Sequence, residues 1–128
     1  VYALSVATHI PWGGFERFLA AAWASVAPGG VLLFSTHGEV ALGQLGAYDN
    51  GAYLPAADRL RRGYDGGRGF AYEPYPYEPD AGYGMSWHRW PAVLPVVETA
   101  LGGAGAVAVT VEEARIEGHQ DLWVCRRR

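Results

Sequence analysis

The chain has 128 residues, a formal net charge of −3 and an apolar content of 50 %. This content excludes a disordered tail, and no stretch reaches the roughly 18 consecutive apolar residues of a membrane-spanning helix. A negative net charge argues against nucleic acid as the partner, and a single cysteine, Cys125, excludes a disulfide framework. We therefore expect a soluble, cytoplasmic protein that binds neither membranes nor nucleic acid.

The first strand is expected at residues 1–7, Val-Tyr-Ala-Leu-Ser-Val-Ala, because this run is almost continuously apolar. A strand that is apolar on both faces is typical of the middle of a parallel sheet. At the start of a chain it has no preceding segment to pair with, and natural domains avoid long apolar edge strands. The pattern indicates that the chain is the later part of a larger domain.

A helix is predicted next, because six apolar residues between Phe15 and Val26 recur with a period of 3.6 residues. Pro28, Gly29 and Gly30 end it, and residues 31–34 form a second buried strand. A strand, a helix of about four turns and a second strand make a βαβ unit, in which the two strands run parallel.

The remaining chain is less regular up to residue 90. A short helix is expected at 55–62, no regular element at 63–84, and a helix beginning near Pro95 and ending at Gly102. Strands are expected at 106–111 and 121–126. The segment between them is too short for a helical crossover, so these two strands should form an antiparallel hairpin.

Three segments together resemble class I S-adenosylmethionine-dependent methyltransferases. Residues 1–11 resemble the fourth strand and following loop of that family, 26–33 its Pro-Gly-Gly turn and fifth strand, and 118–124 its closing strand. The resemblance implies the later half of a doubly wound, Rossmann-like α/β sheet, with two parallel strands, a carboxyl-terminal antiparallel hairpin and flanking helices. Residues 1–128 would be the carboxyl-terminal part of one methyltransferase domain, with an insertion or lid at 39–90.

The same resemblance identifies what this sequence lacks. The family's glycine-rich cofactor loop and acidic ribose ligand precede the fourth strand, and no such loop follows a strand here. The expected cofactor is S-adenosyl-L-methionine, yet the fragment by itself is expected to bind it weakly and to be inactive. The expected function is methyl transfer to a small-molecule acceptor.

Five residues are candidates for the site. Ser5 ends the first strand, where family members contact the methionine part of the cofactor. His9 lies just beyond and is the candidate catalytic base, because histidine titrates in the range needed to remove a proton from an acceptor. His37 and Trp12 are candidate substrate contacts, as is Tyr83 in a tyrosine-rich stretch that suits an aromatic lid.

Four of these candidates also have a purely structural interpretation: a small strand-ending residue at Ser5, hydrogen-bonded loop residues at His9 and His37, and a packing role at Trp12. The four histidines lack metal-ligand spacing, so no metal site is expected.

Two other functions remain open from the sequence. The chain is alternatively a non-catalytic remnant that acts as a dimerisation or binding module, in which a partner such as a second copy covers the first strand. Another doubly wound, nucleotide-dependent enzyme is the remaining alternative.

Overall fold

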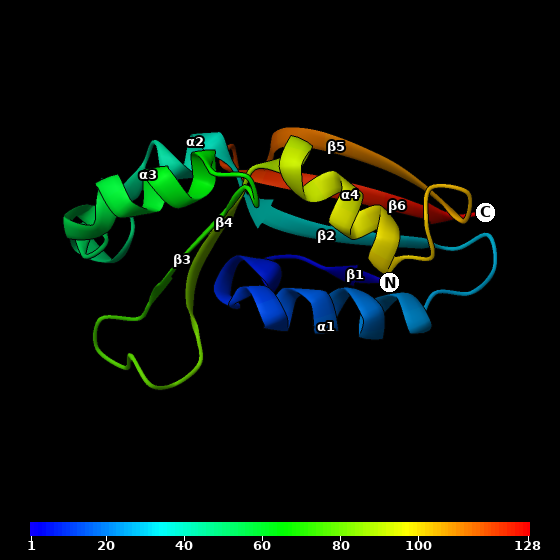
Figure 1. The fold of residues 1–128 in the computed structure, drawn as a ribbon, viewed down its shortest axis with the longest axis horizontal. Coiled ribbons are helices and arrows are strands. Elements are labelled where there is room, and N and C mark those ends of the chain that lie inside the picture. The colour runs from blue at the N-terminus through cyan, green and yellow to red at the C-terminus, as the bar shows by residue number, and fades with distance from the viewer.

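The computed structural model describes residues 1–128 (Figure 1). The helices are α1 (Trp12–Ala24), α2 (Glu39–Leu42), α3 (Ala57–Asp65) and α4 (Trp90–Ala100), and the strands are β1 (Tyr2–Ala3), β2 (Val31–His37), β3 (Phe70–Pro74), β4 (Gly84–His88), β5 (Val107–Ile116) and β6 (Gln120–Arg127). Short 3-10 turns lie between these elements, among them η1 (Ala7–His9). None of the helices has the length and apolar character needed to span a membrane.

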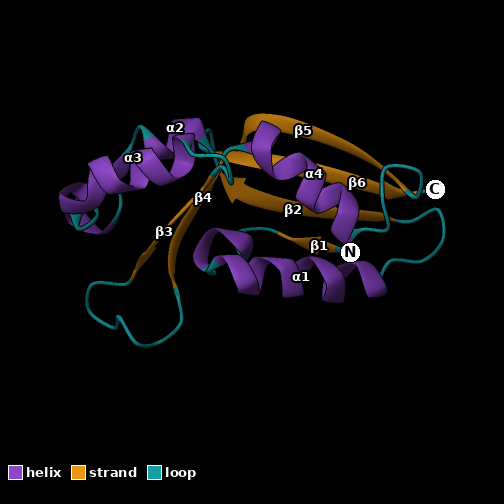
Figure 2. Ribbon diagram, in the orientation of Figure 1, coloured by secondary structure: helices purple, strands orange, loops and turns teal.

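All six strands belong to one sheet with β2 at its centre. The order is β3-β4-β2-β6-β5, and β1 also pairs with β2. The pairs β3–β4, β2–β6 and β5–β6 are antiparallel, whereas β1 and β4 run parallel to β2. The β2–β4 ladder is joined only at His37 and Trp87, and beyond this point the β3–β4 hairpin turns away from the rest of the sheet (Figure 2).

The expected fold class is therefore wrong. A doubly wound, Rossmann-like sheet with two parallel strands was expected, whereas the sheet is a curled, mostly antiparallel half-barrel of six strands. Two causes contribute. Strand β3 lies within 63–84, where no regular element was expected, and β4 begins at the end of that segment; the two strands extend the sheet with an antiparallel pair. The strand expected at 1–7 covers only Tyr2–Ala3.

The early end of β1 has a local cause at Ser5. Its φ angle is +57°, a left-handed conformation that breaks an extended strand. The Ser5 amide donates to the Ser35 hydroxyl at 2.8 Å, so the chain turns toward β2 instead of running on beside it. The turn leads directly into η1, which brings His9 to the end of the sheet.

The main core covers one face of the sheet. Side chains at alternate β2 positions, Leu32 and Phe34, pack with Trp123 of β6, and the rings of Phe34 and Trp123 are stacked at 5.4 Å. Both α1 and α4 pack on this face, through Phe15 and Val97 among others. Flanking helices on both faces were implied by the expected fold, but these two share one face.

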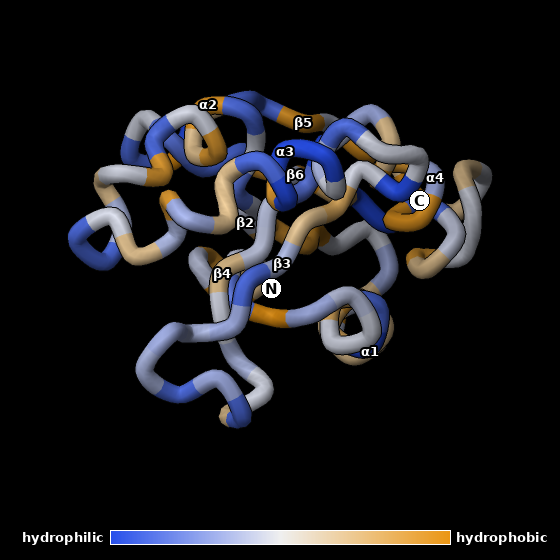
Figure 3. Tube along the Cα trace, turned by 60° about the vertical axis from the view of Figure 1, so that its left-hand side comes forward, coloured by the Kyte–Doolittle hydropathy of each residue, from blue (hydrophilic) through white to orange (hydrophobic).

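A second, smaller core lies under α2, α3 and the β3–β4 hairpin. Its buried residues include Leu60 and Tyr64 of α3, Ala71 of β3, and Trp87 of β4. The region 39–90 therefore contains packed secondary structure of its own. The loop joining β3 and β4 projects beyond the two strands, and most of it is hydrophilic (Figure 3), although Tyr75 at its start packs against the smaller core.

The β5–β6 hairpin confirms the expected antiparallel pairing at the carboxyl end. Its ladder is interrupted between Glu112 and Ile116, where β5 bulges and Ala114 takes a φ of +50°. Bulges of this kind re-aim backbone groups and side chains locally. Here the Ala114 amide turns to donate to the carboxylate of Asp121 at 2.9 Å.

Candidate functional site

A cavity of about 250 Å³ lies where the chain leaves β1 and β2. The two expected histidines meet there: His9 at the end of η1 and His37 at the end of β2, with ring centroids 6.3 Å apart. We call this space the histidine cavity; it is lined by His9, His37, Tyr48, Asp49, Tyr75, Tyr77 and Met85. Adjacent parallel strands end on the same side of a sheet, which explains why residues 28 positions apart face one space.

His9 is partly buried and is held by a backbone contact. Its Nδ1 lies 3.0 Å from the carbonyl oxygen of Gly84, the first residue of β4, and 2.9 Å from the Tyr75 hydroxyl. A carbonyl oxygen only accepts hydrogen bonds, so the contact with Gly84 requires a hydrogen on Nδ1. In neutral histidine the lone pair is then on Nε2, which has no protein partner.

His37 is 2 % exposed and donates through Nδ1 to the carbonyl of Ser86 at 3.2 Å. Its pKa is lowered to about 3, mainly by burial and in part by the nearby His9 and His119, while the bond to Ser86 opposes this lowering. His37 is therefore neutral at physiological pH.

Tyr48 contributes a hydroxyl without a partner. Its oxygen is buried and makes no hydrogen bond, and burial raises the pKa of the group, so it stays protonated. The Tyr48 ring lies 5.4 Å from that of His37. A buried hydroxyl that lacks a partner is costly unless something else supplies one. The histidine cavity thus offers a ligand one free hydroxyl, several aromatic faces, and the Nε2 nitrogens of His9 and His37, neither of which has a protein partner.

The tyrosine-rich stretch contributes to the cavity through residues other than Tyr83. Tyr75 and Tyr77 line it, and their rings are stacked at 5.5 Å. Tyr83 is 47 % exposed and is not among the lining residues. Trp12 also lies outside this cavity: its ring packs against Phe70 and lies under the Arg68 guanidinium. Substrate contacts by Trp12 and Tyr83 remain predictions.

Ser5 is engaged within the protein. Its amide donates to Ser35, and its hydroxyl lies 2.9 Å from Nε2 of Gln120, which donates to it. The Gln120 side chain also accepts from the Ser35 hydroxyl at 2.6 Å. Both polar groups of Ser5 are thus used by the sheet, and the chain has no glycine-rich loop after a strand. These residues do not fit a site for S-adenosylmethionine, and the cofactor contact of Ser5 remains a prediction.

Tyr48, Asp49 and Met85 are the lining residues that sequence reasoning missed. Tyr48 and Asp49 lie among short 3-10 turns, and Met85 lies on a strand that the sequence did not predict. No residue pattern in the sequence indicates these positions. In the folded chain, no three histidine, cysteine, aspartate or glutamate side chains converge as a metal-binding group. No protein-family model matches the sequence, and no curated protein matches it significantly.

Proposed function

We propose that the histidine cavity binds the small-molecule acceptor of an S-adenosylmethionine-dependent methyl transfer, and that His9 takes up the proton this acceptor loses. The observation that carries the proposal is the Nδ1 contact of His9 with the Gly84 carbonyl, because it leaves Nε2 free as a proton acceptor in a cavity that also contains the unpartnered Tyr48 hydroxyl. The donor is an expectation from the family resemblance, and no residue of this chain is assigned to hold it.

The lining favours a small acceptor with a flat or apolar body and one ionisable hydroxyl. Rings of His9, His37 and Tyr75 supply faces for stacking, and Met85 supplies an adaptable apolar contact. A hydroxyl oriented toward Nε2 of His9 would lose its proton to that nitrogen. S-adenosylmethionine, when bound, would supply the methyl group by cleavage of its S–CH3 bond, with the thioether as leaving group. Correct alignment of the acceptor would provide most of the rate enhancement, and His9 the proton transfer.

Asp49 at the cavity wall supports this role of His9. Its carboxylate accepts the Tyr53 hydroxyl at 2.8 Å and adds a negative charge to the lining. A nearby carboxylate stabilises an imidazolium that forms during proton transfer. Because burial keeps His37 neutral, it does not oppose this charge, and it contributes a polar ring to acceptor binding.

The acceptor side is tested with phenol as a probe. Phenol added to the protein should shift the NMR signals of the His9 and His37 rings in a saturable way, and His9→Gln should weaken binding. His119→Gln is the matched control, since His119 is near His37 but does not line the cavity. In a form of the protein that includes the expected glycine-rich portion, His9→Gln should lower turnover more than it weakens cofactor binding. Turnover unchanged by His9→Gln at saturating acceptor would contradict the proposal.

The alternative of an association module is favoured by the open side of β1. Tyr2 is 80 % exposed, Val1 51 % and Leu4 43 %, and β1 pairs only with β2. Exposed apolar residues on an unpaired strand edge are typical of strand addition by another chain. Self-association would make the melting temperature depend on protein concentration, and Tyr2→Glu would abolish this dependence. Leu54→Glu, at another exposed apolar residue, is the control.

A further inference from the structure

A second cavity, of about 260 Å³, lies between α3, the start of α4 and the β5–β6 hairpin. We call it the acidic cavity; it is lined by Glu39, Tyr64, Arg89, Trp90, Pro91, Glu113 and Asp121. It shares no lining residue with the histidine cavity. Neighbouring side chains of a strand alternate between faces, so Asp121 lies on the face opposite to Gln120, which bonds Ser5 and Ser35.

Asp121 is the unusual residue of the acidic cavity. It is 2 % exposed, and one carboxylate oxygen accepts a single hydrogen bond, from the Ala114 amide at 2.9 Å. Its other oxygen, Oδ2, has no hydrogen-bond partner and lies so close to Gly38 that a Cβ there would overlap it. Burial raises the pKa of Asp121 to about 6; the Ala114 bond lowers it and Glu113 raises it. At neutral pH this carboxylate is charged, buried and without a cation, which is costly.

The backbone is distorted to hold this carboxylate. Ala114 adopts its positive φ within the β5 bulge, a conformation that an alanine rarely takes. The distortion turns the Ala114 amide toward Asp121. Backbone strain and bulges of this kind occur frequently at functional sites.

A second polar group of the acidic cavity has no partner. Tyr64 is 3 % exposed, and its hydroxyl makes no hydrogen bond although it lines the cavity. Burial and the nearby carboxylates of Glu39 and Asp121 raise its pKa, so the hydroxyl is present as a neutral group. A hydroxyl in the cavity wall that has no protein partner is available to a ligand.

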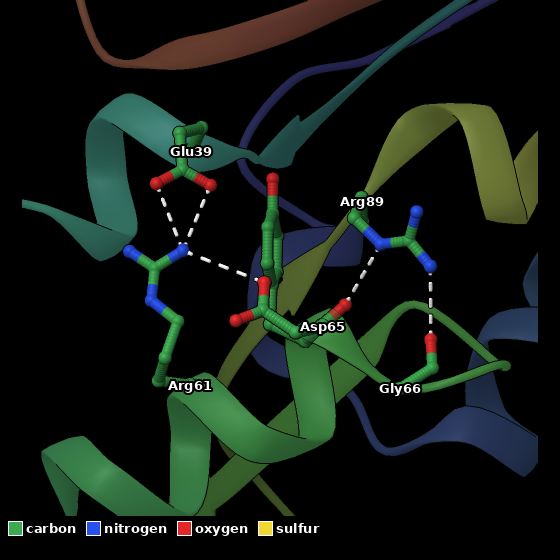
Figure 4. Close-up of polar contacts among 6 residues, drawn as sticks. Glu39, Arg61, Asp65, Gly66 and Arg89 are labelled. Carbon is green, nitrogen blue, oxygen red and sulfur yellow. Dashed lines mark hydrogen bonds and ion pairs between the residues drawn. The ribbon is translucent and has the colours of Figure 1, made fainter.

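The arginines of this region bond to groups other than Asp121 and Glu113 (Figure 4). Arg61 pairs with Glu39 at 2.8 Å, and Arg89 donates to the backbone carbonyls of Tyr64 at 3.0 Å and Gly66 at 2.9 Å. No ion pair joins a cationic side chain to Asp121 or Glu113. Glu113 instead accepts the Trp90 indole N–H at 2.6 Å. The cavity therefore has two carboxylates, Asp121 and Glu113, that form no ion pair.

From these observations we propose that the acidic cavity binds a small organic ammonium ion, with Asp121 and Glu113 as its counter-charges. The ammonium group would donate to the free Oδ2 of Asp121 and to the Tyr64 hydroxyl, and the Trp90 ring would contact its carbon chain. The acidic residues do not converge as a metal-binding group, whereas an ammonium ion can donate hydrogen bonds to oxygens that are more widely spaced. This inference is independent of the role proposed for the histidine cavity.

The test uses n-butylammonium chloride as the probe and butan-1-ol as its neutral counterpart. Titration of the wild-type protein at about pH 7 should shift the amide NMR signals of Gly38 and Ala114 in a saturable way, while butan-1-ol should not. Asp121→Asn should weaken binding roughly tenfold or more, because a charge-assisted hydrogen bond is lost. Glu112→Gln is the matched control: it also removes one negative charge, but from a β5 residue that pairs with Arg115 at 3.2 Å and does not line the cavity.

Asp121→Asn is expected to remain folded, since asparagine still accepts the Ala114 amide and no charge is buried; its amide spectrum checks this directly. Lowering the pH to about 5 should weaken butylammonium binding to the wild type and not to Asp121→Asn. The other charged or titratable groups that line the cavity with Asp121 are Glu39, Tyr64, Arg89 and Glu113. Equal loss in Glu112→Gln, equal binding of butan-1-ol, or no saturable shift in the wild type would each overturn the proposal.

Discussion

The Nδ1 atom of His9 lies 3.0 Å from the carbonyl oxygen of Gly84, a residue 75 positions further along the chain. This contact joins the turn that follows β1 to the first residue of β4, and it selects the tautomer of the histidine. Gly84 itself is buried, and a Cβ there would overlap the backbone of Glu73 across the β3–β4 ladder. The orientation of the proposed base thus depends on a hairpin that the sequence did not predict.

Stability should decrease in mild acid. The folded-state pKa values of His37 and His88 are lowered by burial to about 3, from an ordinary value of 6.5. The unfolded chain then binds more protons than the folded chain between these values, so stability falls as pH falls through this window. Asp121, with its raised pKa of about 6, acts in the opposite direction between about pH 4 and 6.

Between about pH 4 and 6 the unfolded chain binds up to two more histidine protons than the folded chain, and one fewer aspartate proton. We expect the free energy of unfolding to drop by about 1.4 kcal/mol per pH unit below pH 6. Urea unfolding at a series of pH values measures this slope. A flat profile between about pH 6 and 4 would contradict the burial of both histidines.

His88→Leu should stabilise the protein. Both ring nitrogens of His88 are buried and lack hydrogen-bond partners, and the ring lies 4.6 Å from that of Phe15 and 5.0 Å from that of Phe70. Removing unpartnered polar atoms from an apolar site should raise the free energy of unfolding by about 1–2 kcal/mol and reduce its acid dependence. His119→Leu, at a partly exposed position, is the control. Chemical denaturation that shows a loss of stability in His88→Leu would disprove this expectation.

Gly38→Ala should destabilise the protein by about 1–3 kcal/mol, because the added Cβ overlaps the Asp121 carboxylate. Asp121→Ala in the same chain should relieve most of that loss, since it removes the overlapping atoms. Gly67→Ala provides the control, because a Cβ at Gly67 meets no atom within 4 Å. A double-mutant cycle on unfolding free energies measures the coupling, and additive effects would show that these two residues do not collide.

S-adenosylmethionine should bind this chain weakly or not at all. The polar groups of Ser5 are bonded to Ser35 and Gln120, and no glycine-rich turn follows a strand. Isothermal titration calorimetry of the 128-residue chain should detect no binding at micromolar concentrations. Micromolar affinity for a monomer would contradict this expectation and would support Ser5 as a cofactor contact.

The local elements with strong periodicity were predictable from the sequence. The apolar stripe from Phe15 gave α1, and the short connection after residue 111 indicated the β5–β6 hairpin. Helix α4 begins earlier than expected, at Trp90, and contains Pro95 in its interior. Burial of Val93 and Val97 in the main core stabilises this helix despite the backbone hydrogen bond that proline cannot make.

The fold class was not predictable, because it depends on tertiary contacts. The apolar composition of residues 1–7 favours a long strand, but the Ser5–Ser35 hydrogen bond turns the chain after Ala3. Strands β3 and β4 are short, and the glycine-, proline- and tyrosine-rich sequence around them indicates a loop. The juxtaposition of His9 and His37 followed from their places after two strands, whereas Tyr48 reaches the cavity through turns without a sequence signature.

The state of the His9 ring is the most direct test of the proposed function. Long-range ¹H–¹⁵N NMR on the protein labelled at its histidines distinguishes the nitrogen that carries hydrogen from the one with the lone pair. We expect hydrogen on Nδ1 of neutral His9, and a saturable shift of its Nε2 signal on addition of phenol. Hydrogen on Nε2, or an Nε2 signal that does not respond to phenol, would contradict the role of His9 as the proton acceptor.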